Sequence, residues 1–237
     1  MEQYETLPNG LRLTPGGFPL GTDTMALAGF VRLRPRAAVC DLGCGGGALS
    51  LLLCSTNPTC RVTGIELAES ACAAANKNFS QPALNNRCTL VPGDLRDIRT
   101  LLPAGTFSDA VSNPPYFSAA APRSPNPARA ASRSETACSL DELCAAAFWV
   151  LRNGGRFSLV YRADRLCDVI CALRFHKLEP KRLRLIRHCP GSPVKLILLE
   201  TRKNGSPGLT VEPELLLYQS DGSPTPDCRQ IYHEGGG

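Results

Sequence analysis

The stretch AVCDLGCGGGALSLLL at residues 38–53 decides the fold. It reads as a short apolar strand, a glycine turn and then an apolar helix. Glycines let the backbone approach a ligand closely, and the N-terminus of the following helix points free N–H groups at that ligand. Gly43, Gly45 and Ala48 also satisfy the G-x-G-x-x-G/A pattern of dinucleotide sites. The stretch therefore predicts a strand–turn–helix unit that binds a nucleotide-like cofactor.

The carboxylate of Asp41 separates two candidate cofactors. Asp41 lies two residues before the first glycine, where it can hold the cationic amino acid end of S-adenosylmethionine. The same charge would repel the pyrophosphate of NAD. We therefore expect S-adenosylmethionine, held by Asp41, Gly43, Gly45 and Gly47.

Two further acidic residues end predicted strands. RVTGIE at 61–66 closes on Glu66, roughly 20 residues past the glycines, where this fold binds ribose hydroxyls. CTLVPGDL at 88–95 places Asp94 where it can accept from an adenine amino group. Either acid, taken alone, could equally be a helix N-cap or a turn residue.

The segment DAVSNPPYF at 109–117 carries the chemistry of the substrate. Asn113 offers a side-chain carbonyl, and Pro114 has no N–H, so the backbone there can only accept. Two acceptors that converge on one small donor suit an –NH2 group, and Tyr116 can stack on the ring that carries it. A proline-rich turn that merely closes a strand is the alternative. The glycine turn, Glu66, Asp94 and Asn113 follow four successive predicted strands, and this order favours an amino-group methyltransferase. We also expect Asn113 to lie beside the cofactor.

Together these motifs resemble the amino-group-directed class I S-adenosylmethionine methyltransferases. Further segments are similar to the tRNA adenine-N6 methyltransferases, whose members modify adenine 37 in a valine tRNA; they are FPLGTDTMALA at 18–28, KLEPKRLR at 177–184, VKLILLE at 194–200 and the tail from Leu209 to Tyr232. The resemblance implies a cytoplasmic enzyme that acts on tRNA, and it implies that Asp23 contacts the cofactor.

The order of elements predicts an α/β fold with a doubly wound, Rossmann-like sheet, mostly parallel and closed by a C-terminal antiparallel strand. Strands are expected to end at Asp41, Glu66, Asp94 and Ser112. Beyond them we expect a helix at 141–152 closed by Asn153-Gly154-Gly155, a strand at 156–161, a helix at 165–175 and a hairpin of 182–187 with 194–201. The predicted division is a lead-in at 1–36 that packs on the cofactor site, a methyltransferase domain at 37–204 and a tail at 205–237.

Composition agrees with one compact domain, since 237 residues can bury a sizeable core. No apolar run is long enough for a membrane helix, and the polar start predicts no secretory signal. The 12 cysteines contain no C-x-x-C pair, so we expect no metal site. Small buried thiols in a reducing cytosol account for those in apolar stretches, namely Cys40, Cys54, Cys72, Cys144, Cys167 and Cys171. Cys44 lies inside the glycine turn, where lining the cofactor site and simple tolerance of the position are equally good explanations.

The net charge of +5 is unevenly distributed. Basic residues beside an active site suit contacts to RNA phosphates, which position RNA without reading its sequence. The candidates are Arg123, Arg129 and Arg133, in the loop after Tyr116, and Lys181 and Arg182 in the basic last third. A solvated basic face is the alternative for the second group.

Other readings of the motifs remain open. Glutamine-N5 methyltransferases of peptide release factors share Asn-Pro-Pro-Tyr but carry an extra N-terminal helical domain, whereas about forty residues precede the glycine turn here. Other RNA or DNA amino-methyltransferases share the core as well. A binding protein without catalysis is less consistent with the complete set of Asp41, Glu66, Asp94 and Asn113. The oligomeric state is not predicted.

Overall fold

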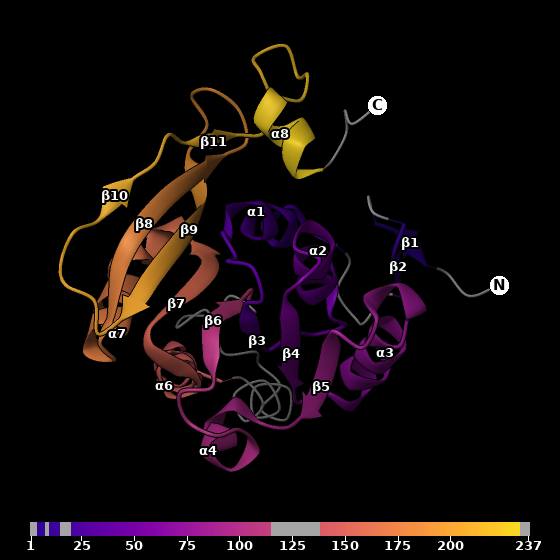
Figure 1. Cartoon of the computed structure of the whole chain (residues 1–237). Helices are drawn as coiled ribbons and strands as arrows, with labels where there is room; N and C mark the ends of the chain where they lie inside the picture. The colour runs from indigo at the N-terminus through magenta and orange to yellow at the C-terminus, as the bar shows by residue number, and fades with distance from the viewer. Residues whose placement is uncertain (1–3, 8–9, 15–19, 115–137, 233–237) are drawn as a thin grey trace, which may run out of the picture.

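The computed structural model describes residues 4–7, 10–14, 20–114 and 138–232. Its centre is a nine-stranded sheet in the order β10-β8-β9-β7-β6-β3-β4-β5, with β11 also paired to β8 (Figure 1). Strands β3 to β7 pair in parallel, and β9 is antiparallel to both of its neighbours. The expected doubly wound sheet with a C-terminal antiparallel strand is confirmed. The strands are β3 (Ala38–Leu42), β4 (Arg61–Glu66), β5 (Cys88–Pro92), β6 (Phe107–Ser112), β7 (Leu151–Arg162), β8 (Leu178–Arg187), β9 (Val194–Lys203), β10 (Thr210–Val211) and β11 (Leu215–Leu216).

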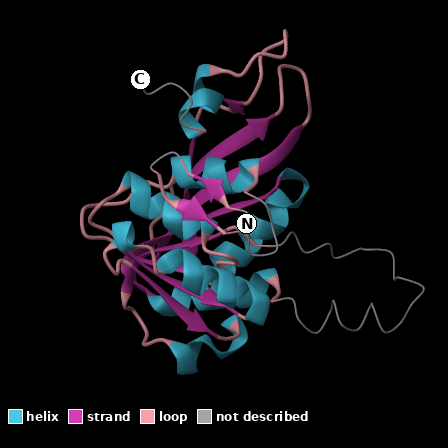
Figure 2. Ribbon diagram, turned by 90° about the vertical axis from the view of Figure 1, so that its right-hand side faces the viewer, coloured by secondary structure: helices cyan, strands magenta, loops and turns pink. Residues whose placement is uncertain are grey.

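Helices cover both faces of the sheet (Figure 2). Alternate strand residues point to opposite faces, so Val39 joins one buried apolar cluster and Cys40 the other. The first cluster holds the helices α1 (Thr22–Phe30), α2 (Ala48–Thr56) and α3 (Glu69–Phe79); the second holds α4 (Ile98–Leu101), α6 (Leu140–Val150) and α7 (Leu166–Phe175). Short 3-10 turns lie at Pro82–Leu84, Leu95–Asp97 and Ala163–Arg165.

The strand ends lie close to their expected positions. β4 ends at Glu66 and β6 at Ser112, as predicted, and β3 runs one residue past Asp41. β5 ends at Pro92, so Asp94 lies beyond the strand and caps the following 3-10 turn. Because the parallel strands are in register, these ends share one edge of the sheet.

The prediction of a helix at 141–152 is wrong about where the helix ends. α6 begins at Leu140 after a capping box of Ser139 and Glu142, and it ends at Val150. The Asn-Gly-Gly run that was expected to close it lies instead inside β7, where the pairing with β6 shifts register. A Cβ on Gly155 would lie 3.1 Å from the carbonyl oxygen of Ser108 in β6, so this glycine permits a close approach of two strands.

The predicted hairpin is present and longer than expected, as β8 and β9. The tail folds back on it, because β10 and β11 both add in parallel to β8. The helix α8 (Pro226–Ile231) then contacts α1 (Figure 1). The expected division at residues 36 and 204 stays a prediction, since lead-in and tail residues such as Leu11 and Leu215 share one apolar cluster with α1 to α3.

The lead-in segment packs beside the glycine turn. Its strands β1 (Glu5–Thr6) and β2 (Arg12–Leu13) form a small antiparallel pair. The backbone N–H of Thr14 donates to the side-chain oxygen of Asn78 on α3 over 2.8 Å. The Asn78 amide nitrogen in turn donates to the carbonyls of Thr14 and Gly46, over 2.9 and 2.7 Å. This buried side chain therefore joins the lead-in to the turn.

The cysteine prediction needs one correction. Cys40, Cys54, Cys72 and Cys144 are buried, as expected, but Cys167 and Cys171 are exposed on α7. The helix presents Val169 and Leu173 to the core, and these two thiols lie on its other side. In the described ranges no three His, Cys, Asp or Glu side chains are grouped as metal ligands, and no helix has the length and apolar character needed to cross a bilayer.

Candidate active site

The turn between β3 and α2 is a ready cradle for a ligand. Gly45 has φ +55°, and no atom of the described residues lies within 4 Å of where a Cβ would lie, so among these residues this side of the turn is open. Gly47, with φ +85°, is the residue before α2, and a Cβ there would collide with the ring of Phe79. The turn therefore needs glycine at one position for access and at the other for packing.

Cys44 lies in this turn but points inward. Its side chain is 8% exposed, and a Cβ added to Gly64 on β4 would come within 2.6 Å of its sulfur. Cys44 therefore fills the space above a glycine of the neighbouring strand.

Asp41 is a buried carboxyl at the carboxyl end of β3. It is 1% exposed, and the Ser50 hydroxyl of α2 donates to it over 2.7 Å. Burial raises the pKa of Asp41 to about 7, and Glu66 adds to this, while the Ser50 hydrogen bond acts in the opposite direction. A cation bound beside Asp41 would stabilise its ionised form.

Glu66 holds the turn from the next strand. Its Oε2 accepts from the backbone N–H of Gly45 over 2.9 Å. Its Oε1 accepts from the N–H groups of Leu67 and Ala68, over 3.0 and 2.8 Å. Glu66 therefore fixes the glycine turn, and its contact with a ribose stays a prediction.

Asp94 is engaged locally. It accepts from the backbone N–H of Arg96 over 2.9 Å and forms an ion pair with the guanidinium of the same residue. The hydrogen bonds from Arg96 lower the pKa of Asp94. This is the N-cap role named above as the alternative for Asp94; a contact with an adenine amino group would share the same carboxylate.

Asn113 follows β6 and is oriented by a residue of α1. Its amide nitrogen donates to the Thr24 hydroxyl over 2.9 Å, 89 residues away in sequence. No donor among the described residues reaches its amide oxygen, which is left as an acceptor. The backbone N–H of Thr24 donates to the carboxylate of Asp23 over 3.0 Å. Asp23 therefore orders the start of α1, and its contact with a cofactor stays a prediction.

Register brings the predicted residues to one place. Asn113, Asp41, Glu66 and Asp94 follow or end four adjacent strands, in the order β6, β3, β4 and β5. Pro114 is buried beside them, and Tyr116 lies outside the described residues. In open α/β sheets this edge is where ligands bind.

The expected RNA contacts divide into two groups. Arg123, Arg129 and Arg133 lie outside the described residues. Lys181 donates to the carbonyl oxygens of Ser206 and Gly208, so its ammonium holds the tail against β8.

Arg182 joins neighbouring elements through ion pairs and a ring contact, which its sequence context did not reveal. It forms ion pairs with Glu200 and Glu212, both at 2.8 Å, and its guanidinium lies 4.2 Å from the centre of the Phe30 ring. Its side chain is only 13% exposed, so little of it is presented to RNA.

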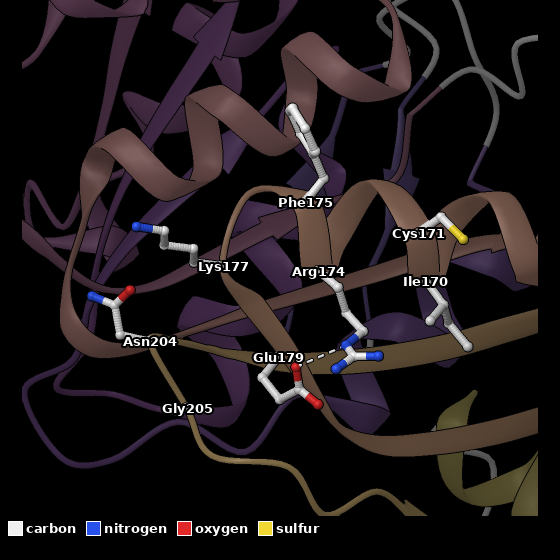
Figure 3. Close-up of a pocket in the computed structure, with 8 residues that line it drawn as sticks. All are labelled: Ile170, Cys171, Arg174, Phe175, Lys177, Glu179, Asn204 and Gly205. Atoms are coloured by element: carbon white, nitrogen blue, oxygen red, sulfur yellow. Dashed lines mark hydrogen bonds and ion pairs between the residues drawn. The ribbon is translucent and has the colours of Figure 1, made fainter.

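An open hollow of about 720 Å³ lies away from these motifs, between α7, the start of β8 and the end of β9. Figure 3 shows Arg174 directed at Glu179, with which it pairs at 3.1 Å, and the ring of Phe175 pointing away from both. None of the predicted site residues that the structure describes lines it.

The residues at the glycine turn fit S-adenosylmethionine. No described atom lies within 4 Å of a Cβ placed on Gly43 or Gly45, so a ligand can approach the backbone of the turn there. The buried Asp41 carboxyl lies at the same turn, and its hydroxyl partner Ser50 does not neutralise it. A ligand with a cationic amino acid end satisfies both features.

Comparison with known proteins agrees with this geometry. The methyltransferase small domain family matches residues 21–180. The chain belongs to that family. It is an S-adenosylmethionine-dependent methyltransferase, and its sequence groups it with the tRNA1(Val) (adenine(37)-N6)-methyltransferases. One of these, from Porphyromonas gingivalis, is 30% identical over 189 residues, which cover 77% of this chain and 74% of the relative. Another, from Vibrio campbellii, is 26% identical over 87% of this chain and 84% of its own length.

Solved structures support the fold of this methyltransferase. A predicted O-methyltransferase from Agrobacterium tumefaciens superposes with a TM-score of 0.74 at 20% identity, covering 90% of this chain and 96% of the other. Geranyl diphosphate C-methyltransferase from Streptomyces coelicolor, solved with S-adenosyl-L-homocysteine, gives a TM-score of 0.55 at 13% identity, covering 75% and 80% of the two chains.

Proposed function

We propose that this enzyme methylates the exocyclic N6 amino group of an adenine in tRNA, and specifically adenine 37 of a valine tRNA, in the cytoplasm. The observation that carries the proposal is the orientation of Asn113. Thr24 engages its amide nitrogen, so the amide oxygen is left to accept from an –NH2 group. The names of the relatives supply the identity of the tRNA and of the base.

Binding of the two reactants is assigned to different residues. Asp41, Glu66 and the glycines would hold S-adenosylmethionine, which supplies an electrophilic methyl group when bound. Asn113 and the carbonyl of Pro114 would each accept one proton of the target amino group. Two such hydrogen bonds favour a pyramidal nitrogen, and they aim its lone pair away from the ring.

No strong general base is needed at this site. The N6 lone pair is delocalised into the adenine ring, which makes the nitrogen a weak nucleophile, but the nitrogen becomes acidic as it gains the methyl group. Positioning by Asn113 and Pro114 is therefore the main contribution of the chain, and positioning can supply about 7–11 kcal/mol at most. The base must first leave its stack, which costs a few kcal/mol, and stacking on Tyr116 would return about 1–3 kcal/mol.

A carboxamide substrate presents the same –NH2 chemistry, so a release-factor glutamine is the second candidate. Purified enzyme, labelled S-adenosylmethionine and either bulk tRNA or a release factor separate the two. Label in tRNA that elutes as N6-methyladenosine after nucleoside digestion supports the proposal. Label in the release factor with none in tRNA would replace it.

A further inference from the structure

A second polar cavity lies at the other edge of the sheet. Its volume is about 260 Å³, and it opens where β3, β6 and β7 begin and β9 ends. The strands of the sheet run from this edge toward the glycine turn, and a five-residue strand such as β3 spans about 17 Å. The cavity is therefore separate from the site described above, and the inference drawn from it does not rest on the proposed function.

Five arginines line this cavity: Arg34, Arg36, Arg152, Arg156 and Arg202. Among the described residues the one acid in its wall is Asp109, a buried residue whose carboxylate pairs with Arg156 at 2.7 Å and accepts from the Ser108 hydroxyl. Asp109 is thus committed to a single arginine, so four positive charges remain without a carboxylate partner in the described part of the chain.

Several basic side chains elsewhere on the described surface are instead neutralised by a nearby carboxylate. Arg162, Arg165, Arg174, Arg184 and Arg187 each form an ion pair. Guanidinium groups stay charged at every physiological pH, so four of them around one concavity repel one another. A bound anion would relieve this repulsion.

One of these side chains lies close to the backbone of β7. Gly154 lies in the irregular part of β7 with φ +70°, and a Cβ there would lie 3.5 Å from a guanidinium nitrogen of Arg202. The Arg202 head therefore rests against the strand beside Arg152 and Arg156. The planar guanidinium fork matches the oxygens of a phosphate group.

We propose that this cavity, which lies at the edge where the parallel strands begin and is called the amino-edge cavity below, binds a phosphate group. Phosphate is favoured because its several oxygens can be shared among convergent arginines. The volume of the cavity lies just below the range of about 300–1,000 Å³ that is usual for drug-sized ligands. The occupant is accordingly inorganic phosphate, pyrophosphate or a backbone phosphate of RNA.

Isothermal titration of the full chain with pyrophosphate tests this, with sodium chloride of matched ionic strength as the reference. The variant R152Q/R202Q removes two exposed, unpaired charges and leaves the Arg156–Asp109 pair intact. R229Q on α8 removes one exposed arginine outside the cavity and is the control for a change of surface charge. We expect the double variant to bind at least ten-fold more weakly and R229Q to bind as the wild type does.

Equal pyrophosphate affinity in all three proteins, or no binding beyond the chloride reference in the wild type, would overturn the proposal. R34Q provides a second variant in case R152Q/R202Q unfolds, which thermal melts would reveal, and it should weaken binding in the same direction.

Titrations with tRNA at several salt concentrations then distinguish a phosphate of RNA from a free phosphate as the ligand. If RNA supplies it, the double variant lowers the slope of log K against log salt by about 0.7–0.9 for each lost contact. If a free phosphate supplies it, that slope is unchanged while pyrophosphate binding is lost.

Discussion

At the scale of single residues, the site depends on how one amide is turned. An Asn side chain presents either its oxygen or its nitrogen to a ligand, and only the oxygen can accept from an –NH2 group. The amide nitrogen of Asn113 donates to the Thr24 hydroxyl, which lies outside the motif, and this arrangement leaves the amide oxygen for the ligand. Thr24 is therefore a positioning residue that acts through Asn113.

Thr24→Val removes the acceptor for the Asn113 amide nitrogen while keeping the shape of the side chain. We expect kcat for methyl transfer to fall by about 10- to 100-fold, since small misplacements of reacting groups cost that much. Cofactor-site affinity, measured by titration with S-adenosyl-L-homocysteine, should change little, and Thr24→Ser should restore most of the rate. Asn113→Ala should abolish transfer and retain cofactor binding; an active Asn113→Ala enzyme would contradict the mechanism.

We expect Asp41 to make cofactor binding depend on pH. Burial raises its pKa to about 7, so its stabilising contribution to the apo fold is full below the unfolded value of about 3.9 and is lost as pH rises through 7. A cationic ligand needs the ionised carboxylate, so below pH 7 binding must release a proton. Cofactor affinity should therefore rise between pH 6 and pH 8.

Titrations with S-adenosyl-L-homocysteine at three pH values check this dependence. Asp41→Asn should bind more weakly and show a flatter profile over that range. Ser50→Ala removes the hydrogen bond that favours the ionised form, so its profile should move to higher pH. Profiles of the same shape for wild type and Asp41→Asn would show that another group titrates.

At the scale of elements, the glycine turn is followed by α2 and contacts Phe79 of α3 and Glu66 at the end of β4. Gly47 combines a positive φ with contact to the Phe79 ring, so Gly47→Ala meets both a strained backbone and a clash. We expect the free energy of unfolding to fall by about 2–4 kcal/mol. Gly191, in the β8–β9 turn, has φ +78° with open space around it, and Gly191→Ala should lose only the smaller backbone contribution. Equal losses in urea unfolding would mean that the Phe79 contact contributes nothing.

The C-terminal helix supports the element that carries Thr24. The Tyr232 hydroxyl after α8 lies 2.6 Å from the Thr22 hydroxyl, and a Cβ on Gly29 of α1 would lie 3.0 Å from Ile231. Gly29→Leu should therefore displace α8, lowering both the melting temperature and methyl transfer. The double variant Gly29→Leu with Ile231→Ala should recover part of both. If Gly29→Leu melts lower but transfers methyl groups at the normal rate, α8 has no bearing on the site.

At the scale of the whole molecule, the sequence predicted what is local in the chain. The ends of β4 and β6, the glycine turn and the antiparallel β9 were visible because each is a contiguous pattern of apolar, glycine and acidic residues. Partners that meet only in the folded chain were not visible. Asn78 reaches Thr14 across 64 residues, and Arg182 resembled an RNA contact until Glu200 and Glu212 were seen beside it.

Other differences have a simple physical origin. β10 and β11 have two residues each, too few for any periodicity, so the tail carried no strand signal. Asn153-Gly154-Gly155 has the composition of a helix stop, but the pairing of β6 with β7 uses it as an irregularity in a strand. The amino-edge arginines are scattered from Arg34 to Arg202, and the sheet brings them to one cavity.

Transfer of a labelled methyl group to two valine tRNA transcripts, identical except for adenine or guanine at position 37, tests the central claim most directly. The account predicts one methyl group per adenine-37 transcript, recovered as N6-methyladenosine, and none in the guanine-37 transcript. Equal label in both transcripts, or methylation of any nucleoside other than adenosine, would contradict it.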